Sequence, residues 1–330
     1  MTAENSAPLP LRQNQTENFT LRSAVVTGPT GTVGMALLRA LRAKDITVYA
    51  VLRPDSPRAV RMTEMARAYG VIPVPCALSE LSLLPQHIPP SVDAFFHLAW
   101  ENTFGAAARN ELDSQLRNVR HTLDAVRAAK QLGCKVFIGA GSQAEYGRAE
   151  GALMPATPAF PENGYGMAKL CAGQMSRVEA QSLGLRHIWA RVLSVYGPYD
   201  GAGTMVSSVL RTLLQGETPA CTKGEQLWDF LYSADAAEAL VAMAEKGRDG
   251  AVYPLGSGQA KPLRGYLEAM RDAVNPSLTL GLGAVPYGEK QVMHLQADLT
   301  ALTRDTGFVP RNSFAQGIAK TITWMKEEQA

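Results

Sequence analysis

The chain has 330 residues, of which 46% are hydrophobic and 19% are charged, and its formal net charge is +2. This composition is that of an ordinary globular protein, with enough apolar residues for one large domain or two closely joined ones. The small net charge, with no Lys/Arg block longer than a pair, gives no electrostatic basis for binding nucleic acid.

Four cysteines, Cys76, Cys134, Cys171 and Cys221, lie far apart without any CxxC motif. We expect reduced core thiols here and no metal site. Residues 1–20 are polar and lack the apolar stretch of a signal peptide, so they are expected to form a disordered tail. No run approaches the ~18 apolar residues of a membrane span. The sequence therefore predicts a cytoplasmic protein without a membrane partner.

Short apolar runs alternate with amphipathic segments through the first two thirds of the chain. Strands are expected at 23–28, 46–52, 71–75, 92–99, 135–142 and 186–197. Helices are expected at 32–43, 62–70, 110–132 and 165–183. Continuous apolar strands separated by helices indicate a parallel sheet covered on both faces. The predicted fold is therefore a doubly wound α/β Rossmann fold.

Beyond residue 197, Gly/Pro-rich loops separate shorter elements, which predicts a smaller domain. We expect a dinucleotide-binding domain at 21–197, with a return segment at about 228–255 that includes a strand at 251–255. Residues 198–227 and 256–330 are expected to form an interleaved substrate-binding cap.

The sequence "AVVTGPTGTVG" at 24–34 places Gly28, Gly31 and Gly34 between a strand and a helix. Glycine allows backbone conformations and close approaches that a Cβ forbids. The free N–H groups and dipole at the start of a helix form an anion site. Because the loop begins a βαβ unit, it predicts the pyrophosphate site of a dinucleotide. The alternative is a tight turn without a ligand.

The residue after the second strand distinguishes between the two common dinucleotides. An acidic residue there bonds the ribose 2′-hydroxyl of NAD, whereas an arginine accepts the 2′-phosphate of NADP. The sequence "VLRPDSPR" places Arg53 first, and Asp55 is expected to point away. The sequence thus favours NADP, with NAD possible. A solvated loop arginine is the alternative.

In "YGMAK", Tyr165 and Lys169 are four residues apart and share a face if the segment is helical. An ammonium beside a phenol favours the phenolate, which predicts a lowered tyrosine pKa and a usable acid/base. Ser142 ends the fifth strand, at the sheet edge where open α/β folds bind ligands.

These residues carry a resemblance that extends along nearly the whole chain. The chain resembles the extended short-chain dehydrogenases/reductases, a family of nucleotide-sugar epimerases, dehydratases and reductases. The matching segments, in chain order, are "TGPTGTVG", "FFHLAW", Asn118 in "LRNVRHTLDAVRAA", "GSQAEYG", "YGMAK", "RVLSVYGP", "WDFLYSADAAEAL" and "DTGFVPRNSFAQGIAKTITW".

The resemblance implies a catalytic triad of Ser142, Tyr165 and Lys169. Tyr165 exchanges a proton with a sugar hydroxyl or ketone, Lys169 holds the nicotinamide ribose, and Ser142 bonds the reacting oxygen. The implied cofactor-binding residues are Gly28, Thr30, Gly31, Thr32, Val33, Gly34, Arg53, Leu98, Ala99, Tyr165, Lys169 and Val192. The implied substrate-binding residues are Trp100, Glu101, Gln143, Ser194 and Trp228. For Trp100, Glu101 and Trp228, plain packing is the alternative.

Several positions depart from the family's pattern. Gln143 and Ala144 replace the Asp-Glu pair of the sugar 4,6-dehydratases, which argues against dehydration. Ser194 and Trp228 replace the usual Asn and Arg near the substrate diphosphate, so another cation such as Arg211 or Lys223 is required if the substrate is a nucleotide sugar. Ala77 replaces an aspartate that commonly meets the adenine, leaving that end to Arg53 and backbone groups.

The sequence therefore predicts an NADP(H)-dependent enzyme of nucleotide sugars, most simply a reductase of a 4-keto sugar. The alternatives are a nucleotide-sugar 4-epimerase with tightly bound NAD, a non-catalytic dinucleotide sensor, and a reductase of a steroid-like or flavonoid-like ketone.

A homodimer is also expected, through the helices at 110–132 and 165–183. A stripe of Leu112, Leu116, Val119, Leu123 and Val126 is expected to cover the sheet. Small residues beside it are expected to let a second subunit approach: Ala125, Ala128, Ala129, Ala168, Ala172 and Gly173. Good helix formers on a solvated face are the alternative.

The remaining residues with possible chemistry are assigned to structure. We expect His97 to be a packed histidine and Asp235 to stabilise the first turn of a helix. The methionines at helical spacing are expected in the core: Met62, Met65, Met167 and Met175.

Overall fold

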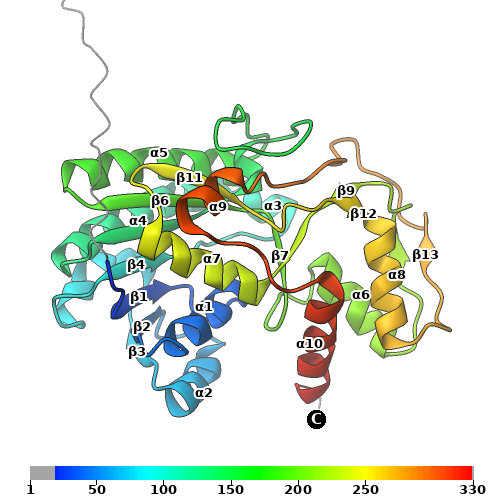
Figure 1. The fold of residues 1–330 in the computed structure, drawn as a ribbon, viewed down its shortest axis with the longest axis horizontal. Helices are drawn as coiled ribbons and strands as arrows, with labels where there is room; N and C mark the ends of the chain where they lie inside the picture. The colour runs from blue at the N-terminus through cyan, green and yellow to red at the C-terminus, as the bar shows by residue number, and fades with distance from the viewer. Residues whose placement is uncertain (1–18, 329–330) are drawn as a thin grey trace, which may run out of the picture.

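The computed structural model describes residues 19–328, and the expected tail at 1–20 lies almost wholly outside this range. A seven-stranded sheet forms its centre, with strand order β11-β6-β5-β4-β1-β2-β3 (Figure 1). All neighbouring strands of this sheet run parallel. The strands are β1 (Ser23–Thr27), β2 (Thr47–Leu52), β3 (Ile72–Pro75), β4 (Ala94–His97), β5 (Val136–Ser142), β6 (Arg186–Val192) and β11 (Ala251–Leu255).

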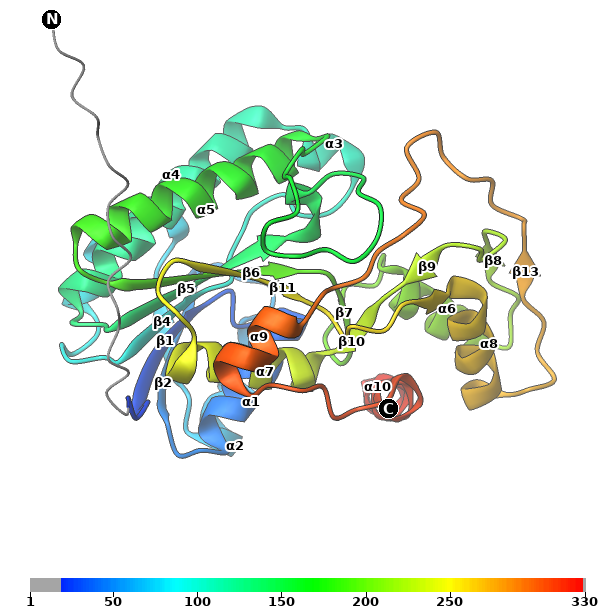
Figure 2. The same ribbon diagram turned by 45° about the horizontal axis from the view of Figure 1, so that its top comes forward.

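Helices cover both faces of the sheet. Figures 1 and 2 place one pair of helices on one face and another group of helices on the opposite face. The pair is α4 (Leu112–Gln131) and α5 (Gly164–Ser182), and the group is α1 (Thr32–Arg42), α2 (Ala59–Tyr69) and α7 (Ser233–Lys246). Alternate strand residues supply the two layers, since Ala24 and Val26 join one core cluster while Val25 joins the other. The predicted doubly wound parallel fold is confirmed.

The sixth strand differs from its prediction. The segment expected as one strand at 186–197 is split into β6 and β7 (Ser194–Tyr196). The β7 strand leaves the central sheet and pairs in parallel with β10 (Phe230–Tyr232). An unbroken apolar run does not reveal this change of partner, because the sequence pattern is the same on both sides of the break.

Past this point the chain builds a smaller layer with its own apolar core (Figure 2). Tyr196, Phe230, Tyr266 and Phe314 form an aromatic cluster in it, with ring centroids 4.5–6.0 Å apart. Its helices are α6 (Met205–Leu214), α8 (Leu263–Val274) and α10 (Phe314–Glu327). Its short strands are β8 (Ala220–Cys221), β9 (Leu227–Trp228), β12 (Lys261–Pro262) and β13 (Gly281–Leu282). The helix α9 (Thr300–Thr306) packs against α7 and β11.

Through its hydrogen bonds, Asp229 links the chain segments that enter and leave this smaller layer. Its carboxylate is fully buried between β9 and β10. It accepts backbone N–H bonds from Ser257 at 2.6 Å, Gly258 at 3.0 Å and Ala297 at 3.0 Å, and a bond from the Ser257 hydroxyl at 2.6 Å. A buried carboxylate is tolerated because its oxygens are satisfied in this way.

The long helix α4 presents the predicted face only in part, since Val119 and Val126 of the expected stripe are buried. Leu112 and Leu116 are about two-thirds exposed, whereas Ala125, Ala128 and Ala129 are buried within the same subunit. On α5, Ala168 and Ala172 are likewise buried, and the predicted small-residue interface is wrong. The alanines face the sheet because their size lets the helix pack closely against it.

Three other expectations concern the methionines, the cysteines and Asp235. Met62 and Met65 are in the core as predicted, but Met167 and Met175 are about half exposed on α5. Cys171 is exposed on the same helix, so the prediction of four core thiols holds only for the other three. Asp235 accepts bonds from the backbone of Arg311 and Asn312 and from the Asn312 side chain, which confirms its structural assignment.

Candidate active site

The glycine loop connects β1 to α1, and its three glycines have different surroundings. Gly28 has a φ of +69° and its hydrogen faces the backbone of Ala99, where a Cβ would come within 2.8 Å. A Cβ on Gly34 would overlap the carbonyl of Gly28. At Gly31 a Cβ would meet nothing closer than 4.0 Å, so this position faces open space.

Gly31 is also the N-cap of α1, with no side-chain cap and no acidic residue in the first turn. The first N–H groups of the helix, which include those of Thr32 and Val33, therefore lack a side-chain partner at the cap. Uncapped N–H groups beside open space fit the anionic diphosphate of a dinucleotide. The neighbouring Thr30 carbonyl accepts a bond from Arg61 at 2.7 Å, which fixes the loop from the side of α2.

Arg53 follows β2 at the same sheet edge, with its side chain 61% exposed. Its Nε lies 3.7 Å from the Asp55 carboxylate. Asp55 therefore turns toward Arg53. The guanidinium remains accessible to a phosphate, but it shares its charge with an exposed carboxylate.

The catalytic candidates come from two elements that meet beside this loop. Ser142 is the last residue of β5 and lies opposite Val192 of β6. Tyr165 and Lys169 lie in the first two turns of α5, whose start is fixed by the Asn163 side chain accepting the N–H of Gly166 at 2.8 Å. Ser142 lies close enough to the Tyr165 phenol to lower its pKa. The structure thus brings together the three predicted residues.

The environment of Tyr165 acts on its acidity in two directions. Burial raises the pKa of the phenol, while Ser142 and the charge of Arg109 oppose this rise. The net direction is upward. The expected lowering of this pKa by Lys169 is therefore not what the structure gives.

Lys169 instead makes contacts of its own. Its Nζ donates to the Ala140 carbonyl at 2.6 Å and lies 3.7 Å from the ring centroid of Trp100. Burial lowers the pKa of this ammonium to about 7. Trp100 also meets the Tyr165 ring edge-on, with centroids 6.1 Å apart. Trp100 therefore packs against two of the three catalytic candidates.

A buried carboxylate, that of Glu145, holds the backbone N–H of Ser142. Glu145 ends a short 3₁₀ turn, η2 (Gln143–Glu145), and its Oε1 accepts the N–H of Ser142 at 2.7 Å. Its other oxygen accepts from Arg191 Nε at 2.6 Å. Both side chains of this ion pair are at most 4% exposed. Gly141 beside them is required, because a Cβ there would overlap Glu145 and the indole of Trp189.

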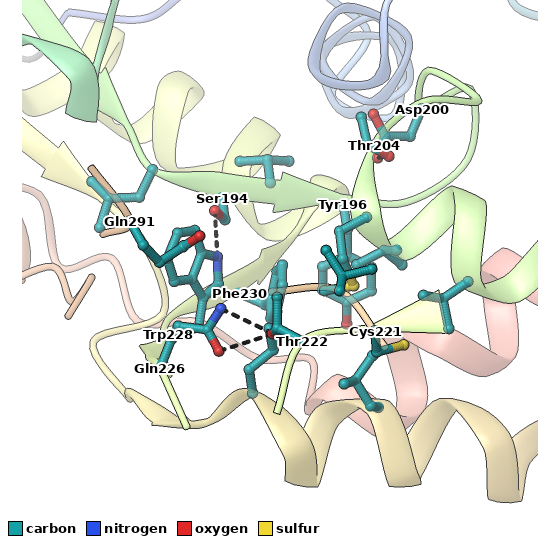
Figure 3. Close-up of a pocket in the computed structure, with 18 of the residues that line it drawn as sticks. Ser194, Tyr196, Asp200, Thr204, Cys221, Thr222, Gln226, Trp228, Phe230 and Gln291 are labelled. Carbon is teal, nitrogen blue, oxygen red and sulfur yellow. Dashed lines mark hydrogen bonds between the residues drawn. The ribbon is translucent and has the colours of Figure 1, made fainter. Parts of the chain in front are cut away.

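A cavity of about 430 Å³ opens beyond β6, between β7, α6 and the short strands of the smaller layer. Figure 3 shows Ser194 and Trp228 in its wall, where the indole N–H donates to the Ser194 hydroxyl at 2.8 Å. Gln226, Gln291 and Thr222 provide further polar groups. The wall contains one carboxylate, Asp200, and no lysine or arginine from the described part of the chain.

The predicted substrate residues therefore separate into two groups. Ser194 and Trp228 line the cavity together, while Trp100 is in contact with Tyr165 and Lys169. Gln143 and Glu101 do not line the cavity; the Glu101 backbone is held at 2.9 and 3.0 Å by the buried Asn118 side chain.

Of the other predicted residues, Leu98 and Ala99 follow β4 next to Gly28. His97 is buried, with Nδ1 3.0 Å from the Thr27 hydroxyl, and burial lowers its pKa to about 3. It is a packed histidine, as predicted. Neither Arg211 nor Lys223 lines the cavity, and Arg211 lies 4.0 Å from Glu328.

Sequence analysis missed four residues that belong to this region. Arg109 lies over the Tyr165 ring, and Asp200 bridges the hydroxyls of Thr32 at 3.4 Å and Thr204 at 2.7 Å. Glu145 and Arg191 complete the set. Arg191 could have been noticed as a charge within an expected apolar strand, whereas Glu145 follows Gln143 in a polar turn and carries no such signal.

No described helix is long and apolar enough to cross a membrane. Within residues 19–328, no group of three or more His, Cys, Asp or Glu side chains is placed to hold a metal ion.

Residues 24–256 match the model of the NAD dependent epimerase/dehydratase family. Among curated proteins, a dTDP-glucose 4,6-dehydratase of Streptomyces griseus is 25% identical over 72% of this chain and 73% of its own length. A dTDP-glucose 4,6-dehydratase of Salmonella typhimurium is 27% identical over 52% of this chain, and the match spans about half of that relative.

Among solved structures, a UDP-N-acetylglucosamine 4-epimerase from Methanobrevibacter ruminantium M1 has a TM-score of 0.83 and 21% identity. The match covers 94% of this chain and all of the other. At this identity the likeness concerns the fold.

Proposed function

This chain belongs to the NAD-dependent epimerase/dehydratase family, and from that premise we propose that it transfers a hydride at a sugar carbon of a nucleotide sugar. The observation that carries the proposal is the meeting of Ser142, Tyr165 and Lys169 beside the open glycine loop. A bound nicotinamide cofactor would accept or supply the hydride. The residues around Gly31 would hold its diphosphate.

The protein's own groups handle the proton. Tyr165 gives a proton to the sugar oxygen when a ketone is reduced and takes it back when an alcohol is oxidised. Ser142, placed beside the Tyr165 phenol, holds the same oxygen. Burial of the phenol excludes water from this exchange.

The first candidate reaction is the reduction of a 4-keto sugar with NADPH. Arg53 supports this choice because an exposed guanidinium at the end of β2 suits a 2′-phosphate. The free state of all four cysteines supports a reducing cytoplasm as its place.

The second candidate is a 4-epimerase with tightly bound NAD. The family description names NAD, and Asp55 lies close enough to Arg53 to compete with a phosphate for its charge. In that reaction the hydride returns to the opposite face of the same carbon, so the cofactor need not leave.

Dehydration is disfavoured by the residues after Ser142. Ala144 carries no proton, and Glu145 is committed to the Ser142 N–H, the Trp189 indole and Arg191. A carboxylate in three such contacts and without exposure cannot exchange a proton with a substrate.

The nucleotide half of the substrate is assigned to the cavity behind Ser194 and Trp228. A diphosphate there would find no lysine or arginine among the lining residues. The N-terminus of α6 lines the cavity through Thr204, Met205 and Val206, and the cap residue Thr204 makes no side-chain cap bond. Its backbone N–H groups are the remaining positive group for a diphosphate.

The two reactions differ in what happens to the cofactor. Purified protein mixed with NADPH and a nucleotide-linked 4-keto-6-deoxy sugar should lose the near-ultraviolet absorbance of NADPH. If no such sugar causes a loss, the reductase is excluded. Release of tightly bound NAD on denaturing the purified protein, with interconversion of two 4-epimers, would establish the epimerase.

The homodimer is also part of the proposal, with a different face from the one predicted. Helices α4 and α5 lie side by side (Figure 2), and both carry exposed apolar side chains. They are Leu112, Leu116, Met167, Met175 and Val178. Exposed apolar side chains on two adjacent helices are suited to contact with a second copy by twofold symmetry.

A further inference from the structure

Arg109 provides a cation above the ring of Tyr165. The guanidinium carbon lies 4.3 Å from the ring centroid, and the Nε of the half-buried side chain has no hydrogen-bond partner in the part of the chain that the structure describes. None of the ion pairs formed within residues 19–328 includes Arg109. Its charge is therefore not neutralised by a carboxylate and acts on the phenol it covers.

The backbone on both sides of Arg109 is held in place. Arg109 ends the short helix α3 (Ala106–Arg109), and the Ala108 carbonyl accepts a bond from Gln115 at 3.2 Å. On the other side, Asn110 Oδ1 accepts the N–H of Gly164 at 3.0 Å. Gly164 directly precedes Tyr165, so this bond ties the arginine's segment to the residue beside the phenol.

Lys169 does not occupy the same place. Its Nζ is 5.9 Å from the Tyr165 ring centroid and is engaged by the Ala140 carbonyl and the face of Trp100. The nearer cation over the phenol ring is Arg109.

We infer that Arg109 is a positioning residue for Tyr165, whose charge favours the ionised phenol during proton transfer. The inference deepens the function proposed above and rests on it for the catalytic role of Tyr165. It assigns to α3 a task that sequence reasoning gave to Lys169 alone.

The other polar groups around the phenol come from each packed element. Ser142 and Glu145 face it from the end of β5 and η2, Lys169 from its own helix, and Trp100 from the loop after β4. The Glu145 charge raises the pKa of Tyr165, but Arg191 pairs with that carboxylate. Ser142 and Arg109 are then the groups that lower the pKa of Tyr165.

The test follows ionisation of Tyr165 directly, without substrate, in protein carrying ¹³C-labelled tyrosine. Tyr165→Phe assigns the resonance. The midpoint of its titration should move upward in Arg109→Gln and return most of the way in Arg109→Lys, because lysine keeps the charge. Asn110→Ala, which frees the segment but keeps the arginine, should move it upward by less. Arg264→Gln removes an exposed arginine of α8 paired with Glu268 and should leave it unchanged.

Turnover gives a second measure. Arg109→Gln should lower kcat at neutral pH by about tenfold or more, with the pH profile displaced in the same direction as the titration. If the titration midpoint of Tyr165 is the same in Arg109→Gln as in the wild type, the inference is overturned, whatever happens to turnover. If the midpoint moves but no sugar is turned over by the wild type, the proposed reaction fails and the influence of Arg109 on the phenol stands.

Discussion

Arg191 Nε donates to Glu145 Oε2 at 2.6 Å, and this buried ion pair fixes the end of the strand that carries Ser142. Glu145 also accepts the Ser142 N–H at 2.7 Å and the Trp189 indole N–H at 2.9 Å. Strands β5 and β6 are thereby joined beside the catalytic site by side chains as well as by the sheet ladder.

Replacing Glu145 by Gln should strongly destabilise the fold, since the buried charge of Arg191 then lacks its partner. The expected loss in the free energy of unfolding is about 3–5 kcal/mol, measured by urea denaturation. The matched control is Glu162→Gln, which breaks the more exposed pair with Arg148 and should leave the unfolding midpoint nearly unchanged. Equal midpoints for the two variants would contradict the structural role of the buried pair.

Tyr165→Phe should abolish turnover while keeping the cofactor bound. Loss of the phenol oxygen removes the proton donor, so kcat should fall by about 10²–10⁴-fold. Cofactor affinity, measured by fluorescence titration, should change little because the ring and its packing remain. Tyr69→Phe, at an exposed position on α2, is the control. A Tyr165→Phe protein with unchanged turnover would favour an active site elsewhere, and a wild type that binds cofactor without turnover would favour a sensor.

The double replacement of Leu112 and Leu116 by Glu should convert a dimer into a monomer. Charges on the exposed apolar face of α4 and α5 would have to be buried against the second subunit. Light scattering of the wild type at micromolar concentration should give about twice the chain mass of 35.5 kDa. The variant should give the chain mass, while Val60→Glu on α2, equally exposed, should not alter the dimer. A wild-type monomer would refute the proposal.

Two buried histidines should make the fold sensitive to acid. Burial lowers the pKa of both His97 and His187 to about 3, against an ordinary value near 6.5. Between these pH values the unfolded chain binds more protons than the folded one, so stability falls as the pH decreases through this range. Urea midpoints measured from pH 7 to pH 4 should show the decline.

Replacing His187 separates the contribution of the buried histidines to this pH dependence of stability from the contribution of the carboxylates. It stacks between Phe137 and Trp189, with centroids 5.8 and 6.1 Å away. His187→Phe should keep the stack and flatten the pH dependence, although the lost bond to Ser176 lowers stability at every pH. The exposed His87→Gln should retain the wild-type slope. Equal slopes in all three proteins would show that the buried histidines do not cause the decline.

The central sheet, its helices and the meeting of Ser142, Tyr165 and Lys169 could be predicted because local patterns determine them. Apolar runs define β1 and β5, left-handed Gly70 and Gly184 end helices where predicted, and the spacing of Tyr165 and Lys169 fixes their common face. These features depend on residues close together in the sequence.

The failures concern features set by distant contacts. The split of β6 and β7 depends on pairing with β10, and the outward face of α4 depends on which side the sheet accepts. The helical periodicity of α4 shows a side with leucines and a side with alanines. Packing against the sheet determines which of these side chains are buried. Arg109 was not identifiable because its helix is 56 residues before Tyr165 in the sequence, and no local spacing links them.

The hydrogen bonds of Asp229 limit where this chain can be cut without losing a buried contact. Every donor to this buried carboxylate comes from Ser257, Gly258 or Ala297, whereas the family match ends at residue 256. A chain cut at that boundary would keep the carboxylate and lose all its donors. The matched region therefore lacks the groups that satisfy this carboxylate, and exchanging the terminal segment between relatives as a module requires that these donors be exchanged intact with it.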